Sequence, residues 1–163
     1  MNQKKNYKID ICIIGGLGHV GLPLGIKFAE KKLKVCLYDT DKKNSSIVKN
    51  KKMPFIEYGA KKILAKVIDN GNLYVSNSPS DISFAKYVFI TIGTPIDEYL
   101  NPKTTEFLNI IKNLKRYFNS NQIIIVRSSV FPNVCQQLLN ILKDKNKKNW
   151  NLAYCPERIV QGY

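Results

Sequence analysis

Three glycines in the segment "IIGGLGHVGLPLG" have the spacing GxGxxG, at Gly16, Gly18 and Gly21. An apolar run at residues 9–14 precedes them and apolar residues four positions apart follow them, so they lie between a predicted buried strand and a predicted helix. In this context the first glycine permits a tight turn, the second lets main chain approach a diphosphate, and the third lets the helix lie close to the strand. The free N–H groups at the start of the helix also favour an anion. The segment therefore predicts a dinucleotide-binding turn.

Asp39 stands at the end of the next predicted strand, 18 residues after Gly21. A carboxylate there accepts hydrogen bonds from the adenosine ribose hydroxyls and repels a 2′-phosphate, which favours NAD over NADP as the cofactor. The alternative is that Asp39 caps a helix that begins near Asp41. Within the turn, His19 and Val20 are also assigned to the cofactor site, with His19 beside the phosphates rather than acting as a general base.

Predicted strands and helices alternate along the chain. Strands are expected at residues 9–14, 35–38, 73–75, 87–92, 122–126 and 152–154, and helices near 20–28, 41–50, 60–68, 107–118 and 132–142. This alternation indicates an α/β fold with a doubly wound, Rossmann-type parallel sheet in the strand order 3-2-1-4-5-6 and helices on both faces. A chain of 163 residues fits one domain, with the cofactor where the strand order reverses.

The net charge of +14 raises the question of a nucleic-acid partner. The lysines are spread over many predicted surfaces, arginine is scarce, and no aromatic residues interleave with the densest runs, "EKKLK" and "KDKNKK". We therefore expect a solvated surface and no nucleic-acid partner. A basic nucleic-acid binder is kept as a rival class, and absence of retention on heparin at low salt would exclude it.

The sequence offers neither a membrane span nor a metal-binding pattern. No window approaches the roughly 20 apolar residues of a span, and the basic N-terminus lacks the apolar stretch and cleavage site of a secretory signal. The four cysteines have no CxxC spacing and form no metal-ligand pattern with the single histidine: Cys12, Cys36, Cys135 and Cys155. Reduced thiols and a cytoplasmic location are expected.

Six blocks of sequence, in this order along the chain, resemble the UDP-glucose/GDP-mannose dehydrogenase family of nucleotide-sugar 6-dehydrogenases. The blocks are "GLGHVGLPLG" (16–25), "YDTD" (38–41), "MPFIEYG" (53–59), "ITIGTP" (90–95), "RSSVFPN" (127–133) and "CPERIVQG" (155–162). They cover nearly the whole chain. The resemblance implies an enzyme that oxidises the C6 alcohol of a nucleotide sugar to a carboxylate with two NAD, through capture of the aldehyde by a cysteine thiolate and hydrolysis of the resulting thioester.

The resemblance also assigns residues to the site. It places Gly93, Thr94 and Pro95 in a turn along the cofactor, Ser129 beside the cofactor and the reacting carbon as a residue that orients water, and Glu157 as the acid that orders or activates the hydrolytic water. An acid and a hydroxyl at the carboxyl ends of neighbouring strands also match the usual place of an active site in such sheets.

Each catalytic assignment has an alternative. Ser129 could instead cap the helix that begins near Pro132, and Glu157 could pair with Arg158 or another surface base. Arg127 and Arg158 could hold an anionic nucleotide sugar, although solvated or ion-paired roles are at least as well supported. Cys155 precedes the acid rather than occupying the family's nucleophile block, and is expected to be a packing thiol.

Four positions depart from the family pattern. His19 replaces a usual aromatic, Ser129 a usual threonine and Asn133 a usual glycine, and Gln161 stands where UDP-glucose enzymes often carry a second acid. The "CPERIVQG" block is more similar to enzymes acting on UDP-N-acetylmannosamine, while UDP-glucose and GDP-mannose remain alternatives.

The family's lysine, asparagine and nucleophilic cysteine have no counterpart in residues 1–163. The resemblance therefore implies an apparently truncated NAD-binding domain, without the central helix and the nucleotide-sugar-binding domain. Such a chain is expected to bind NAD without completing catalysis. The longer form is expected to be a homodimer or a higher oligomer. A non-catalytic NAD-binding module is the competing interpretation.

Overall fold

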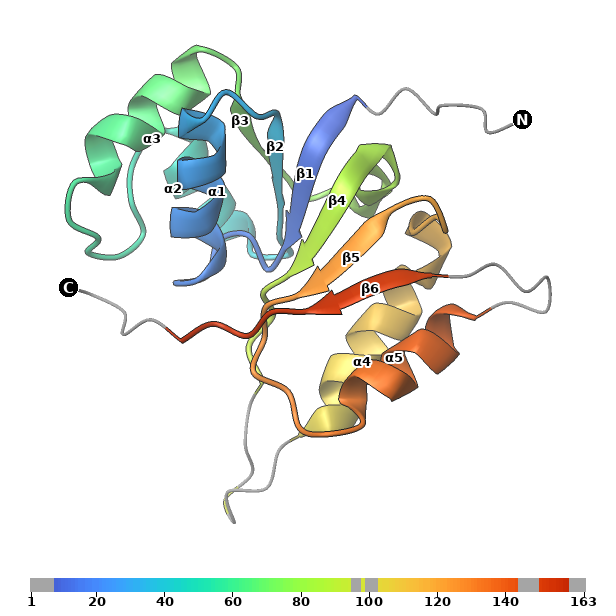
Figure 1. The fold of residues 1–163 in the computed structure, drawn as a ribbon. Helices are drawn as coiled ribbons and strands as arrows, with labels where there is room; N and C mark the ends of the chain where they lie inside the picture. The colour runs from blue at the N-terminus through green and yellow to red at the C-terminus, as the bar shows by residue number, and fades with distance from the viewer. Residues whose placement is uncertain (1–7, 95–97, 99–102, 144–149, 159–163) are drawn as a thin grey trace.

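The computed structural model describes residues 8–94, 98, 103–143 and 150–158 (Figure 1). Within these residues six strands form one parallel sheet in the order β3-β2-β1-β4-β5-β6, which confirms the predicted order. The strands are β1 (Ile9–Ile14), β2 (Val35–Tyr38), β3 (Leu73–Ser76), β4 (Ala85–Ile90), β5 (Ile123–Val126) and β6 (Asn151–Tyr154). Because the order reverses between β1 and β4, the carboxyl ends of these two strands flank the place where doubly wound sheets bind ligands.

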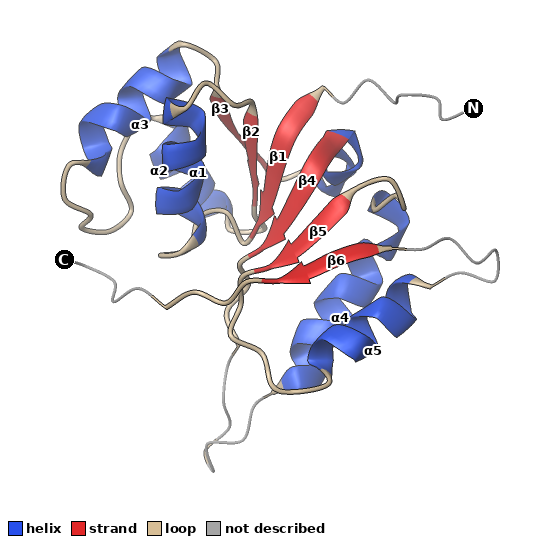
Figure 2. Cartoon of the chain, in the orientation of Figure 1, coloured by secondary structure: helices blue, strands red, loops and turns tan. Residues whose placement is uncertain are grey.

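Helices lie on both faces of the sheet (Figures 1 and 2). One face carries α1 (Gly21–Glu30), α2 (Lys42–Lys49) and α3 (Ala60–Asp69), and the other carries α4 (Thr104–Leu114) and α5 (Val134–Leu142). Two 3₁₀ helices, η1 (Pro79–Phe84) and η2 (Lys115–Tyr117), join the second face. The buried side chains consequently form two cores, one on each side of the sheet.

Strand β1 shows why the second half of a central strand, at residues 11–14, is entirely apolar. Its side chains alternate between the two cores: Cys12 and Ile14 pack on the α4–α5 side, and Ile11 and Ile13 on the α1–α3 side. All four are buried because helices cover both faces of the sheet here. The glycine turn therefore follows directly on a strand that is buried on both faces.

The fourth strand ends earlier than its sequence suggests. The apolar run predicts a strand at residues 87–92, whereas β4 ends at Ile90. The amides of both Arg127 and Ser128 donate to the Ile90 carbonyl, at 2.9 and 3.2 Å, so the regular ladder with β5 stops there. Thr91 turns instead toward the glycine turn, where its hydroxyl donates to the Gly15 carbonyl at 3.0 Å.

Both C-terminal helices also begin at other residues than predicted. α4 begins at Thr104, three residues before the predicted Phe107. α5 begins at Val134, two residues after the predicted Pro132, because Asn133 has a left-handed conformation with φ of 71°. Glycine adopts this conformation without strain, and asparagine tolerates it better than most residues, so the turn before α5 accommodates Asn133.

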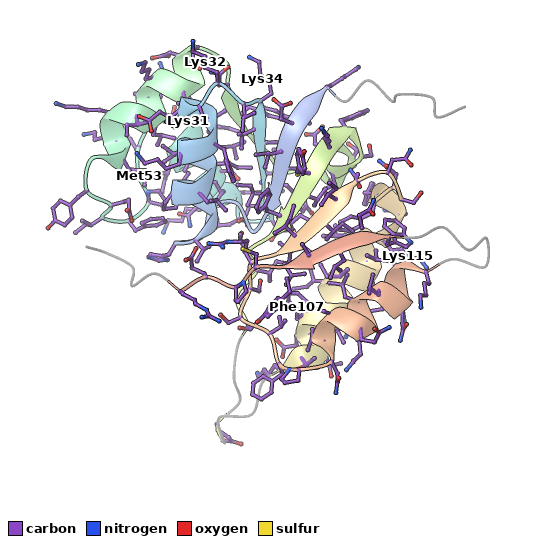
Figure 3. All side chains as sticks on the ribbon, viewed as in Figure 1. Lys31, Lys32, Lys34, Met53, Phe107 and Lys115 are labelled. Carbon is purple, nitrogen blue, oxygen red and sulfur yellow. The ribbon has the colours of Figure 1, made fainter. Side chains whose placement is uncertain are left out.

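Several lysine side chains lie on the outside of the molecule. Figure 3 shows Lys31, Lys32 and Lys34 directed away from the sheet, whereas Phe107 lies inside, between α4 and the sheet. Across the described ranges, no helix combines the length and apolar character needed to cross a membrane. The four cysteines are free thiols.

Candidate functional site

The glycine turn between β1 and α1 is closely packed at two of its three motif glycines. A Cβ atom on Gly21 would lie 2.5 Å from the Gly15 carbonyl oxygen and 2.8 Å from Thr91 Oγ1. A Cβ atom on Gly16 would lie 2.9 Å from the Cα of Leu37. These distances are shorter than carbon atoms tolerate, so the close approach of α1 and β2 to the turn requires glycine at both positions.

Gly18 differs from these two glycines because it is exposed. The nearest atom to a Cβ placed on Gly18 is the Gly15 carbonyl oxygen at 3.5 Å, which is ordinary contact. The protein's own packing therefore does not require a glycine at this position. The bare main chain at the tip of the turn instead suits a ligand that must approach closely.

His19 and Val20 complete the turn. The imidazole of His19 is exposed and stacks on Phe55, with ring centroids 4.1 Å apart. Phe55 belongs to the connection between α2 and α3, which the stack ties to the glycine turn. Val20 faces the other way, into a cleft at the ends of β4 and β5.

The carboxylate of Asp39 lies beside the glycine turn. Its Oδ2 accepts a hydrogen bond from the Leu17 amide at 3.0 Å, and its Oδ1 accepts one from the Asp41 amide at 3.1 Å. The residue that caps α2 is Asp41, whose Oδ1 accepts from the Asn44 amide at 2.9 Å. The interpretation of Asp39 as the helix cap is therefore wrong.

The main chain of Asp39 is fixed from β3. The side-chain amide of Asn77 donates to the Asp39 carbonyl at 2.7 Å, and the Asp39 amide donates to the Ser76 carbonyl at 3.1 Å. The sequence gave no indication of this support, since Asn77 lies 38 positions away along the chain.

Two clefts open on either side of the glycine turn. The first has a volume of about 340 Å³ and is lined by Ile14, Gly15, Tyr38, Asp39, Thr40, Ile92, Ile110, Asn113 and Leu114. The second has a volume of about 250 Å³ and is lined by Val20, Thr91, Ile92, Gly93, Thr94, Arg127, Ser128, Ser129 and Glu157. Ile92 lines both, so the clefts adjoin at the point where the strand order reverses.

The second cleft brings together five of the residues assigned to the site: Val20, Gly93, Thr94, Ser129 and Glu157. Thr94 Oγ1 donates to the Ser129 carbonyl at 3.0 Å, which joins the turns after β4 and β5. Pro95 and Gln161 lie outside the described residues.

Ser129 and its neighbour Ser128 have different environments. Ser129 is exposed at the cleft, and α5 begins at Val134 with Asn133 as its cap residue, so the interpretation of Ser129 as the helix cap is wrong. Ser128 is buried, and its hydroxyl donates to the Ile92 carbonyl at 2.6 Å. Sequence reasoning missed Ser128, because the carbonyl that its hydroxyl bonds lies 36 positions away along the chain.

Glu157 is ion-paired with Arg127. Arg127 Nη2 donates to Glu157 Oε2, and Arg158 contributes its main-chain amide to Glu157 Oε1 at 2.8 Å. Arg127 Nη1 also donates to the Cys155 carbonyl at 3.0 Å and lies 3.3 Å from Cys155 Sγ. Cys155 is exposed, so its expected role as a packing thiol is wrong.

The shape of this region fits a dinucleotide. Gly15, before the tip of the glycine turn, lines the cleft that contains the carboxylate at the end of β2, and Val20, after the tip, lines the cleft formed with the turns after β4, β5 and β6. An adenosine ribose beside Asp39 and a diphosphate at the turn would place the second nucleoside in the cleft with Ser129 and Glu157.

Comparison with known proteins agrees with this geometry. The profile described as "UDP-glucose/GDP-mannose dehydrogenase family, NAD binding domain" matches residues 9–163. The chain belongs to this family. Family members are NAD-dependent dehydrogenases, and NAD is the cofactor that the matched domain binds.

Two similar proteins are 26–29% identical to this chain over the region that they share with it. A UDP-N-acetyl-D-mannosamine dehydrogenase of Methanococcus aeolicus is 29% identical over 99% of the chain and 37% of the relative. A UDP-glucose 6-dehydrogenase of Rickettsia bellii is 26% identical over 94% of the chain and 35% of the relative. The chain thus spans little more than a third of the length of these relatives.

Solved structures of the family show the same fold. The GDP-mannose dehydrogenase of Pseudomonas aeruginosa superposes with a TM-score of 0.85 at 20% identity, over 94% of this chain and 37% of that one. The UDP-D-ManNAc dehydrogenase of Pyrococcus horikoshii has a TM-score of 0.82 at 23% identity, with the same coverage. The Rossmann-type fold is therefore confirmed for the described residues.

Proposed function

We propose that residues 1–163 form the NAD-binding domain of a nucleotide-sugar 6-dehydrogenase. The observation that carries the proposal is the pair of adjoining clefts at the glycine turn, with Asp39 in one and Ser129 and Glu157 in the other. The match of residues 9–163 to the family's NAD-binding domain supports the same function.

Each part of the site has a task in binding. The amides at the tip of the turn, around Gly18, receive the diphosphate, and the Asp39 carboxylate accepts hydrogen bonds from the adenosine ribose and repels the 2′-phosphate of NADP. His19 is assigned to the phosphates, and Val20, Gly93 and Thr94 are assigned to the nicotinamide half. When bound, NAD accepts the hydride from the sugar.

The two catalytic side chains in this chain hold and activate a water molecule. We assign Ser129, whose hydroxyl is exposed at the cleft, to holding a water molecule near the reacting carbon, and the Glu157 carboxylate to ordering or activating it. Both residues come from turns at the carboxyl ends of neighbouring strands, where the sheet holds their main chain in place.

UDP-N-acetylmannosamine, oxidised to the uronate for cell-surface polysaccharide precursors, is the proposed substrate. It is supported by the "CPERIVQG" block and by the names of relatives from Methanococcus aeolicus and Methanocaldococcus jannaschii. UDP-glucose is the alternative that the Rickettsia relatives favour, and GDP-mannose is the third. The free thiols are consistent with the cytoplasm as its compartment.

The 163 residues alone are proposed to bind NAD without oxidising a sugar. The thiol nucleophile, the lysine and the asparagine of the family would come from a central helix and a nucleotide-sugar domain of the longer protein, which we expect to form a homodimer or higher oligomer. This proposal is tested directly: reduction of NAD⁺ by the isolated chain with a UDP-sugar would contradict it, and would also exclude a non-catalytic module.

Calorimetric titration with NAD⁺ tests the cofactor assignment. Asp39→Ala removes a charged acceptor for the ribose hydroxyls, and a charge-assisted hydrogen bond contributes about 1.5–3 kcal/mol, so we expect a loss of affinity of about 10- to 100-fold. Asp41→Ala is the matched control, because Asp41 caps α2 and lies outside both clefts' linings. Equal affinity of Asp39→Ala and the unsubstituted chain would refute the assignment.

A further inference from the structure

Arg127 is the first residue after β5, and its side chain reaches the loop that follows β6. Its guanidinium donates to the Glu157 carboxylate through Nη2 and to the Cys155 carbonyl through Nη1, at 3.0 Å for the carbonyl. One side chain thus bonds two residues of the same loop. The loop is the one that brings Glu157 to the second cleft.

The main chain makes the same connection. Beyond the last paired residues of β5 and β6, the Cys155 amide donates to the Val126 carbonyl at 2.9 Å, and the Glu157 amide donates to the Arg127 carbonyl at 3.0 Å. The loop therefore runs beside the end of β5 as far as Glu157. Arg127 contacts it through both its main chain and its side chain.

The Arg127–Glu157 ion pair lies largely out of water. The side chains of Arg127 and Glu157 are 16% and 20% exposed, whereas in the other three ion pairs among the described residues every side chain is at least 38% exposed. Exposed pairs contribute little because solvent screens them, while a shielded, hydrogen-bonded pair of arginine and carboxylate is stronger and has a defined geometry.

We propose that Arg127 is a positioning residue that fixes the loop after β6, so that the Glu157 carboxylate faces the cleft formed with Gly93, Thr94 and Ser129. The inference rests on the proposed function, in which that cleft receives the nicotinamide half of NAD. Arg127 acts through Glu157 and Cys155. The interpretation of Arg127 as a direct ligand for an anionic sugar is replaced by this one, because its two terminal nitrogens are engaged by the loop.

Amide hydrogen exchange, followed by NMR on the whole 163-residue chain, tests whether Arg127 holds the loop. Arg127→Gln removes both contacts of the guanidinium, so we expect the protection of the Glu157 amide to fall by at least about tenfold. Arg127→Lys keeps the charge but loses the forked geometry, and should restore part of the protection. Arg158→Gln is the matched control, because it removes the adjacent positive charge and leaves the Arg158 main-chain bond to Glu157 in place.

The urea midpoint of each variant shows whether the fold is intact. Unchanged protection of the Glu157 amide in a folded Arg127→Gln would overturn the proposal. If Arg127→Gln does not fold, Glu157→Gln replaces it as the test, since it breaks the same ion pair from the other side and leaves the guanidinium in place. The expected result is again faster exchange of the amide at position 157, and unchanged exchange would overturn the proposal.

Ligand affinities give a readout that a purely structural role would not change. ADP-ribose contains the adenosine, diphosphate and second ribose but no nicotinamide. We expect Arg127→Gln to weaken NAD⁺ binding by about three- to tenfold and to leave ADP-ribose binding unchanged, with partial rescue by Arg127→Lys. An unchanged ratio of the two affinities would overturn the proposal. If the unsubstituted chain binds neither ligand, the proposed cofactor function fails, and amide exchange alone decides the role of Arg127.

Discussion

Gly21→Ala is predicted to lower stability, whereas Gly18→Ala is predicted to weaken cofactor binding with little effect on stability. Both substitutions add one methyl group to the same turn, so any difference between them reports the local surroundings of each glycine. At Gly21 the added Cβ would meet the Gly15 carbonyl oxygen at 2.5 Å, Thr91 Oγ1 at 2.8 Å and the Gly16 Cα at 2.9 Å. At Gly18 it would meet a single atom, at 3.5 Å.

The expected magnitudes follow from these distances. Alanine in place of a helical glycine contributes about 1 kcal/mol through helix propensity, whereas overpacking costs about 1–3 kcal/mol. The clash at Gly21 is the larger effect because the amides of Gly15 and Gly16 are bonded to the Tyr38 carbonyl at 3.0 and 3.1 Å, which holds the turn in place. Gly21→Ala should therefore lower the free energy of unfolding by up to about 2 kcal/mol. Gly18→Ala should change it by less than about 0.5 kcal/mol.

Gly18→Ala should affect cofactor binding, although it hardly affects stability. A methyl group on exposed Gly18 stands where the diphosphate approaches the main chain, so Gly18→Ala is expected to weaken NAD⁺ binding by about tenfold or more while the fold stays intact. Urea unfolding and calorimetric titration on the same samples measure the two properties. The reasoning is refuted if Gly18→Ala binds NAD⁺ as tightly as the unsubstituted chain, or if it is the less stable of the two variants.

Two further predictions concern the buried polar groups. Gln122 is fully buried, and its side-chain amide donates to two main-chain carbonyls at 2.6 and 2.8 Å. Gln122→Leu should therefore lower the free energy of unfolding, measured in urea, by about 2–3 kcal/mol. Gln136→Leu, at an exposed position, should lower it by less than about 0.5 kcal/mol, and equal losses in the two variants would contradict the prediction. A hydrogen bond with Cys36, together with burial, raises the pKa of the Cys12 thiol, so the folded chain keeps a proton that the unfolded chain releases above about pH 8.5. The free energy of unfolding should therefore fall as the pH rises from 8 to 10, and it should fall less steeply in Cys12→Ala. Identical slopes in the two proteins would show that the Cys12 thiol does not cause the fall.

The strand order and the glycine turn could be predicted because their signals are local. A run such as residues 11–14, buried on both faces, is continuously apolar whatever lies around it, and the GxGxxG spacing includes its own structural context. The position of Asp39 follows from the length of the β1–α1–β2 unit. These features need no knowledge of residues distant in sequence.

The predictions that were wrong depend on contacts between distant segments. The end of β4 is set by amides of Arg127 and Ser128, which lie 37 and 38 positions beyond Ile90 and share its carbonyl. The sequence also could not show which base pairs with Glu157, because its partner Arg127 lies 30 positions earlier. Such pairings arise only when β5 and β6 lie side by side, so a single sequence carries no period or motif that predicts them.

The most direct test of the central claim is titration of NAD⁺ into the ¹⁵N-labelled chain, followed by NMR. The account predicts that the largest shifts fall on the amides of residues 16–21, on those next to Asp39, and on Gly93 and Thr94, because these line the turn and its two clefts. No shifts at saturating NAD⁺, or shifts confined to the lysine-bearing surface around Lys31, Lys32 and Lys34, would contradict it.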